Sequence, residues 1–459
     1  MKIYGITSSV LSALIIVSIC GCASFDADEA RRTQTESFTN SMLRLETELL
    51  SKSVTLDDCI VIAMTNNYEV RFAELDRRLG KLAKSLSFSA FLPAVSASVD
   101  YISYENDPIT TSRDYDYESV RAEMPVFMPS SWFLFAAAQH GKISADIAAA
   151  YVRQSIVLKV TGRFYAVAVQ ENLVEALSSQ TKAADETAAR VKAMASEGLA
   201  LMWESDRAAY LASHRLAELE KARRDLNVMR GELCREIGIS PASSGKIRLD
   251  RSGFGDEVRI PVGTVDDMVL KALEVHPELS LADRAVVSGE NEVRRAFCNF
   301  IPVVSVFTTA SFTGNKVMNP PSDNIAMGFK GTWTLFNGFY NTSLYRQAKI
   351  EKQRSEFERE NTFLSIITRV VSAEAALRDA QDEARLSEQA RDVALAKWKD
   401  FDAKSKEGLV PLNDALDAKA ELDTAEVGKI RNEFAVRLAA ANLELAMGVT
   451  ALPYEPVSE

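Results

Sequence analysis

The residue types that carry out acid–base, nucleophilic or metal chemistry occur in this sequence, but they do not converge. Three histidines and three of the five cysteines are scattered, without the spacing of a metal site or a disulfide framework. They are His140, His214 and His276, and Cys59, Cys234 and Cys298. We expect these cysteines to be small buried apolar residues. No glycine-rich nucleotide motif is present, so we predict no enzyme, no catalytic residue, no cofactor and no metal.

Two carboxylates near the end of the chain stand at helical spacing. Asp414 and Asp417 are three residues apart, so a helix would place them on one face. Close to a helix N-terminus, their simplest role is to offset the helix dipole as solvated acids. A more specific role can be assigned only from the helices and strands that surround these two residues.

The chain repeats itself at an offset of 209 residues, with a slip of one residue toward the end of each copy. The corresponding segments are 55–58 and 264–267, 91–93 and 300–302, and 126–127 and 335–336. Each copy opens with a capping box, Thr55 with Asp58 and Thr264 with Asp267. The sequence is therefore a tandem duplication.

After the proline at 93 and at 302, the hydrophobic period changes from helical to two. Apolar rows correspond position for position in the two copies, which predicts one β-hairpin in each, at about residues 94–127 and 303–336. The strands are long enough to cross a bilayer when tilted. Four charged residues fall on the polar face and are predicted to line a lumen: Asp100, Arg121, Glu123 and Lys330.

A long stretch with neither a proline nor a cluster of turn residues follows each hairpin. The chain then turns back at a glycine, Gly198 in the first copy and Gly408 in the second. These features predict two helical hairpins, at about residues 136–237 and 342–447. At 1.5 Å per residue, the outgoing helices would reach roughly 90 Å.

Four strands cannot close a barrel in lipid, because each open edge leaves backbone N–H and C=O groups unpaired. The smallest barrels have about eight strands, so several chains must pool their hairpins. The predicted fold class is mainly α with a small transmembrane β part, a shared pore standing on a shared helical tube. The net charge of −11, without a basic patch, argues against a nucleic-acid partner.

The N-terminus reads as an export signal, because a short apolar run follows Lys2 and ends at small residues. The sequence Ile19-Cys20-Gly21-Cys22 resembles a bacterial lipobox, and Cys22 is the better candidate for lipidation because small Gly21 precedes it. By this resemblance, Ala23 after the cysteine indicates the outer membrane. An ordinary signal peptide is the alternative.

The chain as a whole resembles the TolC-type outer-membrane factors, in their lipoprotein branch. The resemblance rests on the doubled Thr-Leu/Val-Asp-Asp helix start, the doubled Leu/Ile-Pro before the strands, and the segments 333–338 (Trp-Thr-Leu-Phe-Asn-Gly) and 408–418. It implies a homotrimer with a 12-stranded β-barrel and a long periplasmic α-helical barrel. It also implies partners, a periplasmic adaptor and an inner-membrane pump, and passive export.

The resemblance gives candidate roles to two regions. Asp414 and Asp417 match aspartates that line the periplasmic aperture, where a trimer would stack two acidic rings that attract cations. The apolar turns match the adaptor-docking tips, and they contain Gly198, Leu199, Gly408, Leu409 and Val410.

One departure concerns the strand-to-helix junctions. The first copy has Met128-Pro129 in place of Asn337-Gly338, and Phe339 stands where many relatives carry a second glycine.

The favoured function is the outer-membrane channel of a tripartite efflux system for small molecules. The alternatives are a type I protein-secretion duct and a coiled-coil envelope lipoprotein without a pore. The predicted divisions are a signal peptide (1–21), a lipid-anchored segment (22–53), repeat 1 (54–239), a linker (240–262), repeat 2 (263–449) and a tail (450–459).

Overall fold

The computed structural model describes residues 26–49, 53–106, 112–250, 263–314, 323–407 and 409–449. Cys22 and Gly408 lie outside these residues. Among the described residues, no helix combines the length and apolar character needed to cross a membrane. A helix that the sequence did not predict, α2 (Ala27–Leu49), precedes the first repeat.

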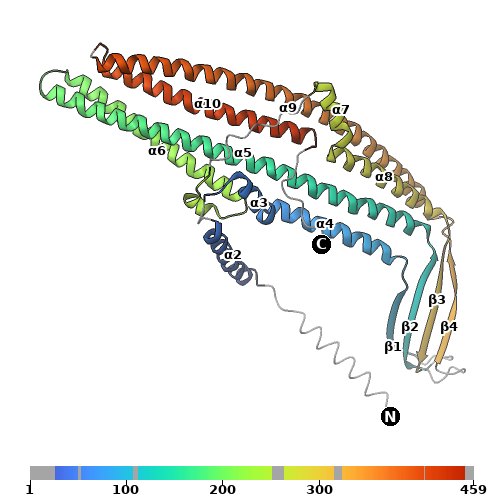
Figure 1. The fold of residues 1–459 in the computed structure, drawn as a ribbon. Helices are drawn as coiled ribbons and strands as arrows, with labels where there is room; N and C mark the ends of the chain where they lie inside the picture. Colours follow the sequence, from blue (N-terminus) through green and yellow to red (C-terminus); the bar gives the residue numbers. More distant parts are fainter. Residues whose placement is uncertain are drawn as a thin grey trace.

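Each repeat contains two short helices, two strands and two long helices in the same order (Figure 1). Repeat 1 runs α3 (Leu56–Asn66), α4 (Tyr68–Ser89), β1 (Ala94–Ser103), β2 (Asp114–Phe127), α5 (Pro129–Ser196) and α6 (Met202–Glu236). Repeat 2 runs α7 (Val265–Val275), α8 (Pro277–Phe297), β3 (Val303–Thr313), β4 (Asp323–Thr332), α9 (Tyr340–Lys406) and α10 (Leu412–Ala446). The short 3₁₀ segments η1 (Pro241–Lys246) and η3 (Cys298–Phe300) complete the order.

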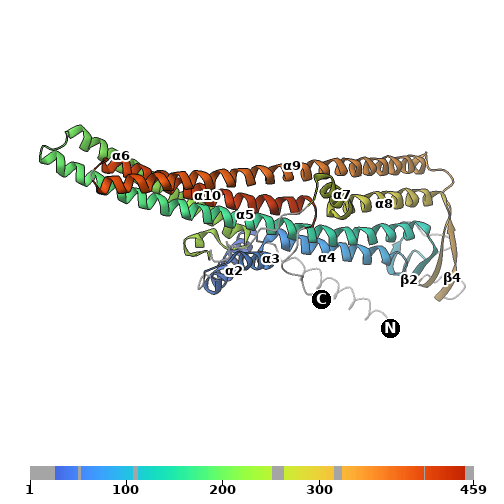
Figure 2. The same cartoon turned by 45° about the horizontal axis from the view of Figure 1, so that its top comes forward.

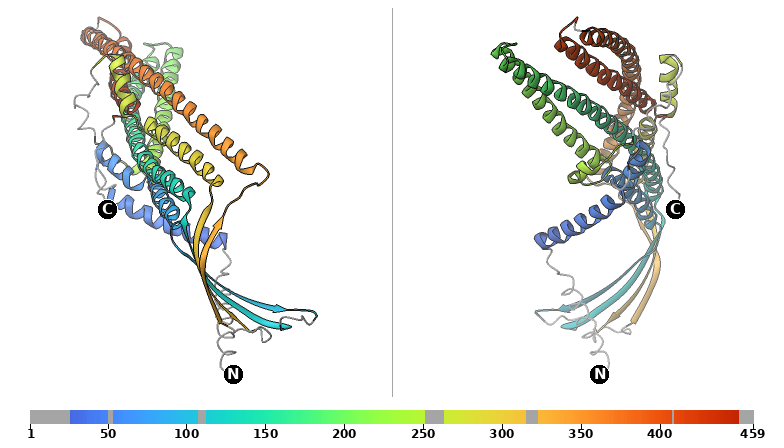
Figure 3. Two further views of the ribbon diagram at one scale, coloured as in Figure 1. Left: turned by 90° about the vertical axis from the view of Figure 1, so that its right-hand side faces the viewer. Right: turned by 60° about the vertical axis from the view of Figure 1, so that its left-hand side comes forward.

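The two hairpins join into one antiparallel sheet in the order β1-β2-β3-β4, so β1 and β4 are its edges. Figure 3 shows the four strands curving away together from the ends of the helices. The register is continuous except for an irregularity between Pro125 and Phe127. The two predicted hairpins therefore form one sheet within a single chain.

The long helices lie side by side along the molecule (Figure 2). Near the sheet, α4 packs on α5, α5 on α8, and α8 on α9, in the order of the strands they adjoin. Farther from the sheet, α6 packs on α5, α5 on α10, and α10 on α9. With 68 residues, α5 is about 100 Å long at 1.5 Å per residue.

The second hairpin is shorter than the sequence predicted, because β4 ends at Thr332 and not near 336. The Trp333 indole Nε1 donates a hydrogen bond to the Phe300 carbonyl at 3.0 Å, and Gly338 and Phe339 then take positive φ values of 66° and 63°. These contacts turn the chain into α9. In repeat 1, α5 begins at Pro129 and not near 136, because proline suits the first position of a helix.

Each repeat has its own apolar core where its short helices meet its long ones. In repeat 1 the core centres on Phe164 and Leu233, and in repeat 2 on Ile366 and Leu443, all of them fully buried. Cys59 and Cys234 are buried in the first core and Cys298 is buried near the sheet, as predicted. Burial raises the pKa of the Cys59 thiol to about 12, so it stays protonated and unreactive.

A glycine closes each core by letting two helix ends meet. Gly238 follows α6 with φ +78°, and a Cβ there would lie 2.5 Å from the Asn66 carbonyl carbon. Gly448 follows α10 with φ +70°, and a Cβ there would lie 2.8 Å from the His276 Cα. Only glycine accommodates both the left-handed backbone and the close approach.

Candidate functional site

The two faces of the sheet differ in chemistry, as the sequence predicted. Residues opposite one another in the register share a face, so Val99 of β1 and Met124 of β2 are on the same side as Met327 and Phe329 of β4. These apolar side chains are exposed in the single chain. Such a face suits contact with lipid, and the other face is polar.

Three of the four predicted pore-lining residues come together on the polar face. Arg121 pairs with Glu123 at 2.8 Å, and the Lys330 Nζ lies 4.0 Å from the other oxygen of the same carboxylate. The Ser305 hydroxyl donates to Glu123 at 2.7 Å, and Arg121 lies 4.7 Å from the centre of the Phe307 ring. The cluster sits at the helix-proximal end of the sheet.

Asp100 shares this face but not the cluster. It lies opposite Tyr117, whereas Arg121 lies opposite Ser96, four residues back along β1, a separation of about 13 Å. The sequence did not predict the roles of Ser305 and Phe307. Their contacts depend on the register between the two hairpins, for which a single sequence carries no signal.

The two tips close in the same way. The Leu199 N–H donates to the Met194 carbonyl at 2.8 Å, and the Leu409 N–H donates to the Lys404 carbonyl at 2.9 Å. Each bond spans five residues and satisfies a carbonyl at the end of a long helix. Leu199 is 69% exposed and Leu409 is 68% exposed, while Val410 is half-buried.

The second tip carries the two aspartates. Asp414 and Asp417 are both exposed on the first turns of α10. Asp417 and Arg215 of α6 help to line a hollow of about 450 Å³ beside α9. The first tip presents Trp203 and Met202 in the corresponding region, and both are exposed. The tips thus share a backbone and differ in chemistry.

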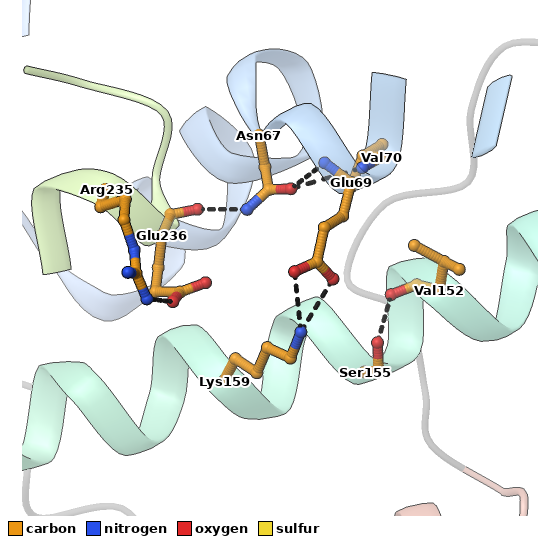
Figure 4. A network of polar contacts seen from close by, with 8 residues as sticks. All are labelled: Asn67, Glu69, Val70, Val152, Ser155, Lys159, Arg235 and Glu236. Atoms are coloured by element: carbon orange, nitrogen blue, oxygen red, sulfur yellow. Dashed lines mark hydrogen bonds and ion pairs between the residues drawn. The ribbon is translucent and has the colours of Figure 1, made fainter. Parts of the chain in front are cut away.

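A polar joint holds the short helices of repeat 1 against its long ones (Figure 4). The Asn67 Oδ1 accepts the backbone N–H groups of Glu69, at 2.7 Å, and of Val70, at 3.3 Å, and its Nδ2 donates to the Glu236 carbonyl at 2.6 Å. The Glu69 carboxylate pairs with Lys159 of α5 at 2.8 Å. Asn67 therefore caps α4 and ties it to the end of α6.

Repeat 2 builds the same joint from different residues. The His276 Nδ1 accepts the Glu278 backbone N–H at 3.1 Å, and the Glu278 carboxylate pairs with Arg369 of α9. The Tyr151 hydroxyl, from α5 of the first repeat, donates to Glu278 at 2.7 Å. His276 is 1% exposed, and its Nε2 has no hydrogen-bond partner within the described ranges.

The surroundings of the second joint shift the pKa values of its ionisable groups. The hydrogen bond from Arg369 lowers the pKa of the Glu278 carboxyl, while burial opposes it. Burial lowers the pKa of the His276 imidazole, which favours the neutral ring. Burial, and then the hydrogen bond to Glu278, raises the pKa of Tyr151.

Sequence reasoning missed both joints as sites, although the repeat offset contained the signal. Asn67 and His276 are 209 residues apart, as are Glu69 and Glu278. Lys159 and Arg369 are 210 apart, after the one-residue slip. His140 and His214 lie on long helices, and His276 caps α8. No cluster of metal-ligand type occurs among the described residues.

The chain thus combines an amphipathic sheet with a layer of very long helices that continue from it. Residues 269–449 match the family model described as outer membrane efflux protein. Most of the second repeat is therefore similar to this family, and the chain as a whole shares its fold with solved outer-membrane channels. A search of curated proteins found no significant match.

Three solved structures illustrate the likeness. The outer membrane protein VceC of Vibrio cholerae is 15% identical, with a TM-score of 0.70, and the alignment covers 86% of this chain and 96% of VceC. The CmeC channel of Campylobacter jejuni is 14% identical, with a TM-score of 0.76 and coverage of 86% and 85%. The MtrE channel of Neisseria gonorrhoeae, in its open state, is 17% identical, with a TM-score of 0.69 and coverage of 86% and 88%.

Proposed function

We propose that this protein is the outer-membrane channel of a tripartite efflux system, a passive duct for small molecules that an inner-membrane pump delivers through a periplasmic adaptor. One observation carries the proposal. A sheet with one exposed apolar face and one polar face continues directly into helices about 100 Å long. Such a chain supplies one sector of a pore and one sector of the tube beneath it.

A homotrimer completes the duct in this proposal. The edge strands β1 and β4 carry backbone groups that must be paired in lipid, and three copies would supply twelve strands. In outer-membrane fractions we expect a heat-modifiable oligomer of three chains, as judged by electrophoresis with and without boiling. A protein that stays monomeric in those fractions would contradict the proposal.

Asp414 and Asp417 form the aperture in this account. Three copies would crowd six exposed carboxylates at the tip end of the tube and draw cations to it. The double variant Asp414→Asn, Asp417→Asn should lose cation selectivity in planar bilayers. The matched control is Asp402→Asn, because the Asp402 carboxylate already pairs with Lys406 at 2.7 Å. Unchanged selectivity in the double variant would refute the acidic rings.

The two tips are the adaptor-docking surface in this account, with Gly198 at the first turn; Gly408 of the second tip lies outside the described residues. The exposure of Leu199 and Leu409 supports this role, because apolar side chains on free turns mark contact surfaces. Cysteines at Leu199 and Leu409 should crosslink to an envelope protein in cells. The control is a cysteine at Arg354, an exposed position near the sheet-proximal end of α9. Equal capture from Arg354 would count against docking at the tips.

Cys22 is the lipid attachment site in this account, and the lipid adds a second hold on the outer membrane. Radiolabelled palmitate should enter the wild type and the Cys20→Ser variant, and it should not enter Cys22→Ser. Labelling of Cys22→Ser would refute this assignment and would leave the channel proposal untouched.

A further inference from the structure

We propose that Arg121, Lys330 and Glu123 form a binding site of net positive charge for anions that carry carboxylate or phosphate groups; this rests on the proposed channel. The site lies on the polar face of the sheet, at the end nearest the helices. All the contacts that support it lie within one chain. Such a site gives the pore a chemical preference among the molecules that reach it.

The site combines two cations with one carboxylate. The Glu123 Oε2 accepts the Arg121 Nε at 3.1 Å and the Arg121 Nη2 at 2.8 Å. The Glu123 Oε1 accepts the Ser305 hydroxyl at 2.7 Å and lies 4.0 Å from the Lys330 Nζ. One negative charge is thus shared between two positive charges, and both carboxylate oxygens are already engaged. One positive charge is left over for a ligand.

The two cations are more exposed than the carboxylate that they share. The side chain of Lys330 is 55% exposed and that of Arg121 is 37% exposed, against 31% for Glu123. The Arg121 Nη1 has no hydrogen-bond partner among the described residues. Guanidinium and ammonium groups are the usual donors to oxyanions in proteins. An anion that reaches this face therefore finds donors that the chain itself does not use.

An aromatic ring holds the guanidinium in place. The Arg121 Cζ lies 4.7 Å from the centre of the Phe307 ring, a distance typical of a cation–π contact. Phe307 lies opposite Gly328 in the register of β3 and β4, and a Cβ at Gly328 would come within 3.2 Å of the ring. Gly328 therefore leaves room for the ring. A guanidinium held in this way loses less conformational freedom when a ligand binds.

The other charges of the strands do not cancel the site. Four acidic residues lie on the apolar side of the register: Asp114, Asp116, Glu118 and Asp323. Asp100 shares the polar face, but it stands about 13 Å away along the strand. That separation exceeds the Debye length of about 8 Å at physiological ionic strength. In the proposed trimer the site would recur three times as a basic ring, an arrangement that suits the passage of anions.

Block of the single-channel current by inorganic pyrophosphate tests the site in the full-length protein. The pyrophosphate enters from the chamber opposite the one that receives the protein, because the long helices stay on the side of addition. We expect it to reduce the K⁺ current of the wild type at concentrations where chloride of equal ionic strength does not. Lys330→Gln removes the surplus charge and should raise the half-blocking concentration about fivefold or more, the factor for one pair of unit charges 4 Å apart in water.

A second variant separates a charge effect from a structural one. Glu123→Gln keeps an oxygen for Arg121 and removes the negative charge, so the half-blocking concentration should fall. A cluster that only holds the strands together would be weakened by both variants, and both would then change the block in the same direction. Lys271→Gln is the matched control, because it removes an exposed lysine from α7, away from the sheet (Figure 1). It should leave the block unchanged.

The outcomes separate this inference from the proposed function. Wild-type channels that conduct and are not blocked by pyrophosphate would overturn the site and leave the channel proposal standing. So would an equal loss of block in Lys330→Gln and Glu123→Gln, or in Lys330→Gln and Lys271→Gln. A protein that inserts and never conducts would overturn the proposed function, and this inference with it.

Discussion

The two repeats fold alike but carry different side chains at their joints and at their tips. At the joints, Asn67 caps α4 and also donates to the Glu236 carbonyl, whereas His276 caps α8 with a neutral buried ring. At the tips, Arg207 in the first repeat corresponds to Asp417 in the second, 210 residues farther along the chain. The comparison shows that duplication preserves the backbone geometry while the side chains diverge. The proposed trimer would therefore be near six-fold in its backbone and three-fold in its side-chain chemistry.

The largest effect should come from the glycines that let helix ends meet. In Gly238→Ala the Cβ would lie 2.5 Å from the Asn66 backbone, and in Gly448→Ala it would lie 2.8 Å from the His276 Cα. The left-handed backbone alone costs about 1–2 kcal/mol for a residue with a Cβ, and the clash adds to it. Both variants should lower the melting temperature in thermal denaturation, Gly238→Ala more strongly.

Gly141→Ala is the control for those variants, because no atom outside the local backbone of its own helix lies within 4 Å of the Cβ it would add. It sits inside α5, where alanine favours the helix by roughly 1 kcal/mol. We expect a slight gain in stability. Equal tolerance of alanine at all three positions would contradict the close approach of the helix ends.

The ion pairs at the two joints should contribute unequally to stability. Glu69 and Lys159 are about half exposed, so Glu69→Gln should cost about 0–1 kcal/mol. Glu278 is less exposed and holds both Arg369 and Tyr151, so Glu278→Gln should cost about 1–3 kcal/mol. Urea denaturation of the two variants measures the difference. A larger cost at Glu69 would reverse this ranking of the joints.

The pH dependence of stability should also distinguish the joints. Burial lowers the pKa of His276 in the folded chain, so the unfolded chain binds a proton first, near pH 6.5. Stability is therefore full above about pH 6.5 and falls as the pH drops toward the folded pKa. His276→Asn, the residue of the first joint, should flatten this part of a melting-temperature profile.

His214→Asn is the control for that experiment, because His214 is exposed on α6. We expect this variant to keep the wild-type slope. The Glu278 carboxyl, with a lowered pKa, acts in a separate window: its contribution is present above about pH 4.3 and is lost at lower pH. A His276→Asn profile identical to that of the wild type would show that the ring does not resist protonation.

The smallest effect should come from the strand-to-helix junctions. Phe339 adopts φ 63° before α9, which costs a side chain of its kind about 1–2 kcal/mol. Phe339→Gly relieves this strain but loses the edge-to-face contact with Phe336, at 5.4 Å between ring centres. We expect a net gain of at most about 1 kcal/mol. Gly338→Ala, with φ +66° and open space, should lose a similar amount; a gain there would contradict the observed backbone.

The hydrophobic periodicity of the sequence and its internal repeat predicted the helices and strands well. The doubled change of period indicated the strands, and the capping boxes at Thr55 and Thr264 begin α3 and α7 as expected. Features that depend on a single contact were not predictable. The end of β4 depends on the bond from Trp333 to Phe300, and the cluster around Glu123 depends on how β2 meets β3. No periodicity in the sequence records such contacts.

Single-channel recording in planar bilayers tests the central claim most directly. The purified full-length oligomer should insert and give discrete conductance steps, because in the proposed trimer three copies of the amphipathic sheet would enclose a polar lumen. A stable oligomer that inserts and never conducts, under any applied voltage, would contradict the claim that this chain builds a duct.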